Sequence, residues 1–390
     1  MTSLLVIIVL VLLAIGLWQL TKIFDLTQSG VTKDSTQVAN DTDNKIQGYL
    51  LFGFLAFIYI FTIYGLLKWG GLVLHTPASA HGEQIDSLMD TTWIVIFAVQ
   101  TVTQALLHYF GFKYSGKKDQ KAFYFSDSNR LEFIWSVIPA IVLAVLILYG
   151  LYAWTNIMFV DEDEDVIVVE LYAQQFNWTA RYSGDDNVLG KANVRYIEGV
   201  NSVGVDMSDK NAQDDKVVKE LHLPKGKKIL FKMRSQDVLH SAYMPHFRAQ
   251  MNCVPGMVTQ FAFEPIYTTD EMREMQFMQE KVVNINKIRA ERSLALVAKG
   301  EPALDPYTFN YLLLCNKICG ASHYNMQMKI IVESPEDYKK WLKGLPSVAD
   351  EVKTEKATPK EGQTEVKVAD SAKVKTKDTT LVASKIVASK

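Results

Sequence analysis

Long apolar runs fill the first 155 residues of the chain, and shorter alternating stretches follow them. Four of the runs, at 4–20, 49–67, 92–112 and 133–154, have the roughly 17–25 mostly apolar residues that a membrane-spanning helix needs. The first run could instead be a signal peptide, but no basic residue precedes it and no small-residue cleavage site directly follows it. The pattern therefore predicts four retained membrane-spanning helices.

Basic residues in the connecting segments predict the orientation of these helices. The segments 21–47 and 113–130 contain lysines and an arginine, whereas the segment 70–90 contains no Lys or Arg. Because short loops rich in Lys and Arg stay on the cytoplasmic side, we expect everything after Trp154 to lie outside. In a bacterial cell this is a multi-pass protein of the inner membrane with a periplasmic domain. Gln100, Gln104 and His108 lie at helical spacing in the third run, which predicts that this face packs on a larger membrane partner.

Beyond residue 165 the pattern changes to that of β-strands. Five stretches are β-branched or aromatic and partly alternating, at 166–173, 228–234, 258–263, 309–314 and 326–332. Short strands with irregular connections predict a β-sandwich or a Greek-key barrel. The segment 184–216 resembles a loop, and 266–300 resembles a helix that begins at "TTDE". The methionines at 272, 275 and 278 are more typical of a packing face than of a copper-collecting row, and the tail 346–390 is predicted to be disordered.

Candidate metal ligands gather in the segment "CNKICGASHYNM", residues 315–326. Cys315, Cys319, His323 and Met326 follow the spacing Cys-x3-Cys-x3-His-x2-Met, and His240, at the end of a predicted strand, offers a further ligand. A disulfide between the two cysteines is an alternative in a domain outside the cytoplasm. Thiolate, imidazole and thioether together form the soft set that selects copper, because zinc rarely binds a thioether and an iron–sulfur cluster needs more cysteines.

Two exclusions follow from composition and motifs. The formal net charge of −2 gives no reason to expect a nucleic-acid partner. The chain has no Cys-x-x-Cys-His, so we expect it to carry no attached haem.

Several motifs together resemble one known family. "DVLHS" at 237–241, "VPG" at 254–256 and "CNKICGASHYNM" at 315–326 are similar to the dinuclear copper centre, CuA, of cytochrome c oxidase subunit II. "LEFIWSVIPAIVL" at 131–143 resembles a membrane helix of that family, and "QQFNW" at 174–178 resembles its aromatic segment near the copper. The resemblance implies a membrane-anchored α + β protein with a cupredoxin-like β-barrel. Its domains would be two additional N-terminal helices at 1–70, the family's helix hairpin at 71–155, the CuA domain at 156–345 and the tail at 346–390.

The resemblance also implies roles for individual residues. Cys315 and Cys319 would bridge two coppers, His240 and His323 would each cap one, and Met326 and the carbonyl of Lys317 would be weak axial ligands. Lys317 stands where the family usually has a Glu that helps to bind magnesium at the subunit I interface, which puts the magnesium site in doubt.

Further residues acquire expected roles in electron and proton transfer, in part from the resemblance. Phe176, which replaces the family's Trp, and Trp178 would lie where electrons arrive, with acidic residues such as Asp237 steering the donor. Glu132, at the inner end of the fourth run, could be a solvated helix-start charge that the helix dipole favours or a proton donor; the resemblance favours the mouth of a proton channel in subunit I.

The resulting hypothesis is the electron-transfer subunit of a proton-pumping haem–copper terminal oxidase. It would take electrons from cytochrome c or a c-haem subunit and pass them to haem in subunit I, where O2 is reduced to water. Its partners would be subunits I and III, the donor and membrane lipid. Two alternatives stay open, which are the CuA domain of a nitrous oxide reductase-like enzyme and a membrane-anchored copper chaperone. The membrane hairpin at 131–143 favours the oxidase over the first of these.

Overall fold

Four long helices precede a β domain. The computed structural model describes residues 2–28, 41–73, 75–117, 120–160 and 165–357. The helices are α1 (Thr2–Gln28), α2 (Asp41–Trp69), α3 (Gly82–Lys113) and α4 (Asn129–Met158). α2, α3 and α4 are each long and apolar enough to cross a membrane, as predicted. The assessed apolar part of α1, Val6–Thr21, is shorter than a span, so a first membrane crossing stays a prediction.

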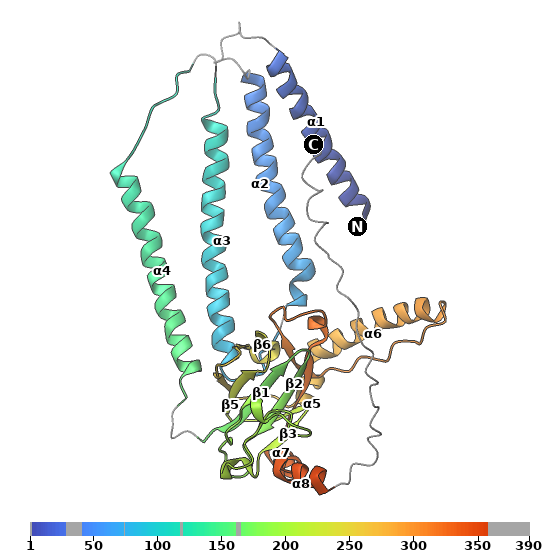
Figure 1. Ribbon diagram of the computed structural model, residues 1–390. Coiled ribbons are helices and arrows are strands. Elements are labelled where there is room, and N and C mark those ends of the chain that lie inside the picture. The colour runs from blue at the N-terminus through green and yellow to red at the C-terminus, as the bar shows by residue number, and fades with distance from the viewer. Residues whose placement is uncertain (1, 29–40, 74, 118–119, 161–164, 358–390) are drawn as a thin grey trace, which may run out of the picture.

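The helices alternate in direction along the chain. Figure 1 shows α2 running towards the β domain, α3 running away from it and α4 returning to it. The C-terminal end of α3, which includes the basic residue Lys113, therefore lies at the opposite end of the molecule from the β domain. This is the arrangement that the distribution of basic residues predicted.

α2 packs on the polar side of α3. His108 is only 4 % exposed; its Nδ1 lies 2.8 Å from the Gln104 carbonyl oxygen, and its ring lies 6.4 Å from that of Phe54 on α2. A Cβ on Gly48 would lie 2.5 Å from the Phe112 ring, so the two helices approach closely at a small residue, as membrane helices often do. The expectation that a separate partner covers this face is wrong at His108, because α2 of the same chain covers it.

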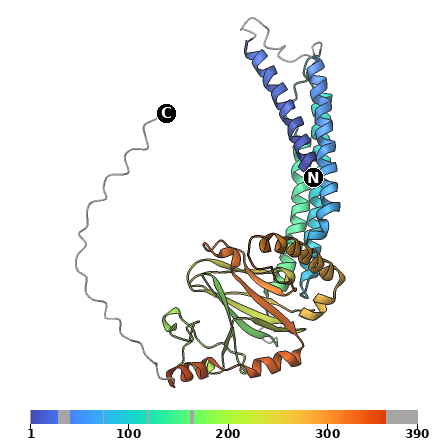
Figure 2. The same cartoon turned by 90° about the vertical axis from the view of Figure 1, so that its right-hand side faces the viewer.

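The β domain is a sandwich of two five-stranded sheets (Figure 2). The first sheet has the order β3-β2-β1-β5-β8 and the second β4-β10-β9-β6-β7. All five predicted strands are present, as β1 (Ile167–Gln174), β5 (Ile229–Ser235), β8 (Thr259–Phe263), β9 (Tyr311–Cys315) and β10 (Gln327–Glu333). The other strands, which the pattern did not predict, are β2 (Asn177–Tyr182), β3 (Lys216–Val218), β4 (Leu221–Pro224), β6 (His240–Met244) and β7 (Ala249–Cys253).

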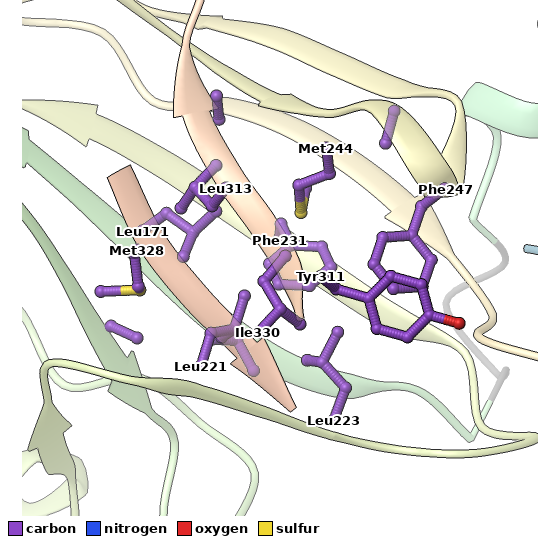
Figure 3. Close-up of a cluster of buried hydrophobic side chains, with 14 of the residues drawn as sticks. Leu171, Leu221, Leu223, Phe231, Met244, Phe247, Tyr311, Leu313, Met328 and Ile330 are labelled. Atoms are coloured by element: carbon purple, nitrogen blue, oxygen red, sulfur yellow. The ribbon is translucent and has the colours of Figure 1, made fainter. Parts of the chain in front are cut away.

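The main core lies between the two sheets. Figure 3 shows Leu171 and Phe231 from the first sheet meeting Tyr311, Leu313 and Ile330 from the second. All five side chains are fully buried. Because successive strand residues point to opposite faces, each strand contributes every second residue, and the burial of β5 alternates accordingly. The sandwich confirms the predicted fold class.

The predicted helical insert is present as two helices, α5 (Thr269–Glu274) and α6 (Gln276–Val297). Thr268 and Glu271 form the reciprocal capping box that the sequence indicated. Met272 and Met278 are buried in the main core and Met275 packs against it. The methionines therefore form a packing face, as predicted.

The C-terminal part of the described chain forms α7 (Pro335–Gly344) and α8 (Val348–Ala357). Val348 is buried in a second core with Tyr172, Val203, Val205 and Ala212. The prediction of disorder from residue 346 is therefore wrong for 348–357, and 358–390 lie outside the described residues. The segment 184–216 is irregular as expected, but it provides the apolar surface that docks α8.

Candidate copper site

Five of the six predicted ligands lie at the end of β9 or on the connection from β9 to β10. Cys315 is the last residue of β9, and Cys319 lies on the loop that follows. His323 begins a short 3-10 turn, η6 (His323–Asn325), and Met326 comes directly before β10. His240 is the first residue of β6, not at the end of a preceding strand, and β6 pairs with β9 so that Ala242 lies opposite Cys315. Strand pairing thus brings a residue 75 positions upstream beside the loop.

The predicted donor atoms converge. The two cysteine Sγ atoms are 3.9 Å apart, far beyond the roughly 2.05 Å of a disulfide bond, and both thiols are free. Cys315 Sγ lies 3.8 Å from His240 Nδ1 and 3.2 Å from the Lys317 carbonyl oxygen. Cys319 Sγ lies 3.6 Å from His323 Nδ1 and 3.8 Å from Met326 Sδ. Each thiol therefore has one imidazole and one weak donor beside it.

Burial shapes the chemistry of these donors. His240, Cys319 and Met326 are buried, whereas Cys315 is half-buried. Burial, with a smaller effect of the neighbouring Cys315 thiol, raises the pKa of Cys319 to about 11. A metal cation between the sulfurs would favour the thiolate forms, because coordination displaces the thiol proton. Two soft sulfurs flanked by imidazoles fit copper.

Asp237 fixes the orientation of His240. His240 Nε2 lies 2.8 Å from Asp237 Oδ1; because a carboxylate oxygen accepts, Nε2 is the donor, and Nδ1 faces Cys315. The same carboxylate accepts from the backbone N–H of Gln175 and of Val238, both at 2.7 Å. Burial alone would raise the pKa of Asp237, but these hydrogen bonds outweigh it and lower the pKa. Asp237 was expected only to steer a donor; the i, i+3 spacing to His240 was the one sequence signal of its contact with the ligand.

Comparisons with known proteins agree with this geometry. The family model "Cytochrome C oxidase subunit II, transmembrane domain" matches residues 67–152, and "Cytochrome C oxidase subunit II, periplasmic domain" matches 167–270. Alternative cytochrome c oxidase subunit 2 of Bradyrhizobium diazoefficiens is 33% identical over 286 residues, which cover 71% of this chain and 88% of the relative. The chain belongs to the cytochrome c oxidase subunit II family.

Two further matches are more distant. Cytochrome c oxidase subunit 2 of Alkalihalophilus pseudofirmus is 23% identical over 305 residues, covering 76% of this chain and 68% of the relative. The crystal structure of the periplasmic domain of subunit II (CoxB) of Bradyrhizobium japonicum is 16% identical and covers 46% of this chain and 93% of that one, with a TM-score of 0.27. The assignment to the family therefore rests on the sequence matches.

Membership of the subunit II family has three consequences. The chain is a membrane-anchored protein with a periplasmic domain. The periplasmic domain of this family implies copper of the CuA type, and His240, Cys315 and Cys319 form a group that could hold a metal. The transmembrane family model begins at residue 67, so α1 and nearly all of α2 lie outside the part that it matches.

The aromatic segment of this subunit II chain, residues 174–178, packs against residues 315–326, which we call the copper loop. Trp178 is fully buried, and its Nε1 donates to the Met326 carbonyl oxygen at 3.4 Å. The Gln175 side-chain amide donates to the Cys319 carbonyl oxygen, and the Gln175–Phe176 peptide bond is cis. A Cβ on Gly320 would lie 2.8 Å from Phe176 Cζ, so the Phe176 ring covers a residue that has to be glycine. Of the two aromatic residues predicted where electrons arrive, only Phe176 is partly exposed.

Glu132 lies apart from the copper site. It is exposed in the first turn of α4, and the Ser128 side chain caps that helix by accepting from the Leu131 N–H. This end of α4 lies away from the β domain (Figure 1). Its predicted role in proton transfer therefore concerns a different part of the molecule, and it stays a prediction.

Proposed function

We propose that this chain binds the two copper ions of a CuA centre and carries electrons into a proton-pumping haem–copper terminal oxidase. The observation that carries the proposal is the pair of free thiols 3.9 Å apart, each with its own imidazole nitrogen at 3.6–3.8 Å. Cys315 and Cys319 would bridge the metal ions, and His240 and His323 would each bind one. Met326 Sδ and the Lys317 carbonyl oxygen would complete the set as weak ligands.

The protein supplies rigidity to this site. When bound, the copper pair accepts and releases one electron at a time. Cys315 and His240 belong to paired strands, and Asp237 forms a hydrogen bond with the imidazole of His240. Trp178 and Gln175 donate hydrogen bonds to carbonyl groups of the copper loop. Ligands held on a paired sheet move little when the charge changes, so little has to reorganise with each transfer.

The proposed partners are an electron donor for the periplasmic domain and the other oxidase subunits for the membrane helices. Electrons would arrive from cytochrome c or a c-haem-bearing subunit and leave to haem in subunit I, with subunit III as a further neighbour. The membrane would be the inner membrane of a bacterium, which the bacterial relatives support. This chain itself would bind no haem.

Lys317 bears on the magnesium site at the subunit I interface. Its side chain is exposed on the copper loop, where an ammonium group could supply the positive charge that magnesium supplies elsewhere, pairing with a carboxylate of subunit I. Lys317→Ala should leave the copper spectrum intact, because only the backbone oxygen faces Cys315. A structure of the complex with a fully occupied magnesium ion at this interface would contradict the substitution.

Replacing single cysteines tests the copper assignment. Cys315→Ser and Cys319→Ser should each abolish the dinuclear copper signal, because a serine hydroxyl cannot replace a bridging soft thiolate. Cys253→Ser is the matched control, since Cys253 is a free buried thiol whose pKa burial raises to about 12. Copper content, visible absorption and the electron resonance spectrum of each purified complex provide the measurement.

The outcome separates three functions. Two coppers per chain, an electron resonance signal split by two equivalent copper nuclei, and oxygen consumption by the complex support the oxidase. One readily released ion per chain indicates a copper chaperone, and nitrous oxide reduction by the purified complex indicates the reductase-like alternative. A Cys319→Ser complex that keeps its copper and its oxidase activity would disprove the assignment.

We also propose that Glu132 lies at the mouth of a proton channel in subunit I. The competing interpretation is a solvated helix-start charge that the helix dipole favours. Glu132→Gln should slow steady-state oxygen consumption while the copper spectrum stays unchanged. Glu83→Gln is the matched control, because Glu83 lies in the first turn of α3 at the other end of the membrane helices. Equal oxygen consumption in the two variants at every pH would return Glu132 to the competing interpretation.

A further inference from the structure

One β-hairpin connects the copper site to the membrane anchor. β6 begins at His240 and β7 ends at Cys253, and these two residues lie opposite each other at the copper end of the hairpin. The other end is the turn 245–248, which lies next to the start of α3 (Figure 1). Four residue steps along β6 correspond to about 13 Å, so a short rigid element separates a predicted ligand from the membrane helices.

Arg248 joins this turn to α3. Its guanidinium forms a fork with Asp86, with Nε 2.7 Å from Oδ1 and Nη2 2.8 Å from Oδ2. Nη2 also donates to the His75 carbonyl oxygen at 2.6 Å, and Nη1 donates to that of Pro245 at 3.1 Å. The Arg248 side chain is only 10% exposed. A bidentate pair of this kind fixes direction as well as distance.

The chain just before α3 is built into the β domain at the same place. The Ala78 N–H donates to the His246 carbonyl oxygen and the Ser79 hydroxyl donates to that of Phe247, both at 2.7 Å. The Ala80 N–H donates to the Glu264 carbonyl oxygen at 3.0 Å. Ala78 is fully buried and belongs to the main core. The turn of the hairpin and the first turns of α3 therefore form one packed unit.

We propose that Arg248 and Asp86 are positioning residues for electron transfer out of the copper site. Their fork fixes the distance and tilt between the copper site and α3, and through α3 the relation of the site to subunit I in the membrane. The inference rests on the proposed function, because it concerns the step from copper to the haem of subunit I. The arrival of electrons from the donor does not pass through this junction.

The test resolves the two electron-transfer steps in the intact complex. Arg248→Asn removes the fork while keeping a residue that tolerates the left-handed backbone at this position, where φ is 52°. Asp86→Ala removes the fork from the other side, and Asp86→Glu should restore part of it. Asp270→Asn is the control, because it breaks the Arg273–Asp270 ion pair of 2.7 Å on the surface of the β domain.

Stopped-flow absorption measurements then follow the reduction of copper and the reduction of haem separately. A displacement of about 1 Å can cost up to about 100-fold in rate, and since the contacts of Ala78 and Ser79 remain, we expect the copper-to-haem step to slow about three- to tenfold. Reduction of copper by the donor and the copper spectrum should match the wild type. An unchanged copper-to-haem step in both fork variants, or equal slowing in Asp270→Asn, overturns the inference, as does loss of the copper spectrum. A wild-type complex without that spectrum would instead disprove the proposed function.

Discussion

The ring of His240 is fixed from several sides. The ring is fully buried, Asp237 binds Nε2, and the Trp178 ring lies 6.2 Å away in an edge-to-face arrangement. Its direction depends on strand register, because β6 pairs with β9 so that Ala242 lies opposite Cys315. A slip of one residue would turn His240 to the other face of the sheet. A single ligand thus depends on a sheet, a carboxylate and an aromatic ring together.

His246, in the turn after β6, should make the β domain sensitive to acid. Its ring packs 5.1 Å from that of Phe309 and 5.6 Å from that of Tyr311, and neither ring nitrogen has a hydrogen-bond partner among the described residues. Burial, with smaller effects of Lys281 and Arg248, lowers the pKa of His246 from 6.5 to about 4. Between these two pH values the unfolded chain binds a proton that the folded chain rejects, so stability falls as the pH falls. The loss at pH 4 is about 3 kcal/mol.

His246→Phe tests this loss, because a phenyl ring keeps the packing and binds no proton. Denaturant unfolding of the full chain in detergent, at pH 7 and at pH 4.5, gives the free energy of unfolding at each pH. The variant should lose less stability than the wild type over this interval. The comparison cancels the acid sensitivity of the copper ligands, which both proteins share. Equal losses would show that His246 titrates with an ordinary pKa.

At the scale of elements, the sequence predicted the helices and strands whose signals lie within a few neighbouring residues. β5 alternates strictly between buried and half-buried residues, and the Thr268–Glu271 capping box marks the start of α5. β3 and β4 have only three and four residues, too few for a period to appear. α8 has only two buried residues, Val348 and Ala349, and the surface that covers Val348 comes from more than 130 positions upstream. A segment with so few apolar residues is indistinguishable from a disordered one until that surface is known.

In the copper site, too, residues that are close in the sequence could be predicted together, whereas contacts between distant segments could not. Cys315, Cys319, His323 and Met326 lie within twelve positions, and the spacing alone indicated soft metal ligands. The hydrogen bond from the Gln175 N–H to Asp237 joins residues 62 positions apart, and that from the Gln175 side chain to the Cys319 carbonyl joins residues 144 apart. The first contact follows from the parallel pairing of β1 with β5, and the second joins loops that belong to the two different sheets. The sequence could therefore propose candidate ligands, whereas the groups that orient them became apparent only in the fold.

Docking of α8 should contribute measurably to stability. Val348 is 1% exposed in the second core, and Val348→Ala removes two methyl groups from it. The expected loss is about 2 kcal/mol in the free energy of unfolding, from transfer of the methyl groups and the space left behind. Val283→Ala on α6 is the control, since Val283 is 66% exposed. Denaturant unfolding should separate the two variants while their copper spectra stay alike; equal midpoints would show that α8 does not dock in solution.

Apolar side chains are exposed along the membrane helices and on the copper loop of the described chain. Among the described residues of α4, only Ala153 is buried, so lipid or another subunit has to cover this helix in the membrane. Ile318 and Tyr324, on the copper loop, are 91% and 89% exposed. Apolar side chains next to a redox site suit contact with a partner protein. We therefore propose the membrane face and the copper loop as the surfaces on which this subunit meets its partners.

Phe176 belongs to the second of these surfaces, and we expect electrons to arrive there. Its ring is half-buried over Gly320, the residue that follows the candidate ligand Cys319. Phe176→Ala removes this cover, so reduction of copper by the native donor should slow about tenfold, as expected when a central aromatic contact of an interface is lost. Phe176→Trp keeps an aromatic surface and should nearly preserve the rate.

The control is Tyr196→Ala, which replaces a 49% exposed residue in the segment 184–216 and should leave the rate of copper reduction unchanged. Stopped-flow reduction by the donor, with the copper spectrum recorded in parallel, distinguishes docking from folding. If Phe176→Ala alters the copper spectrum while the folded fraction is reduced at the normal rate, Phe176 is a core residue and the donor binds elsewhere.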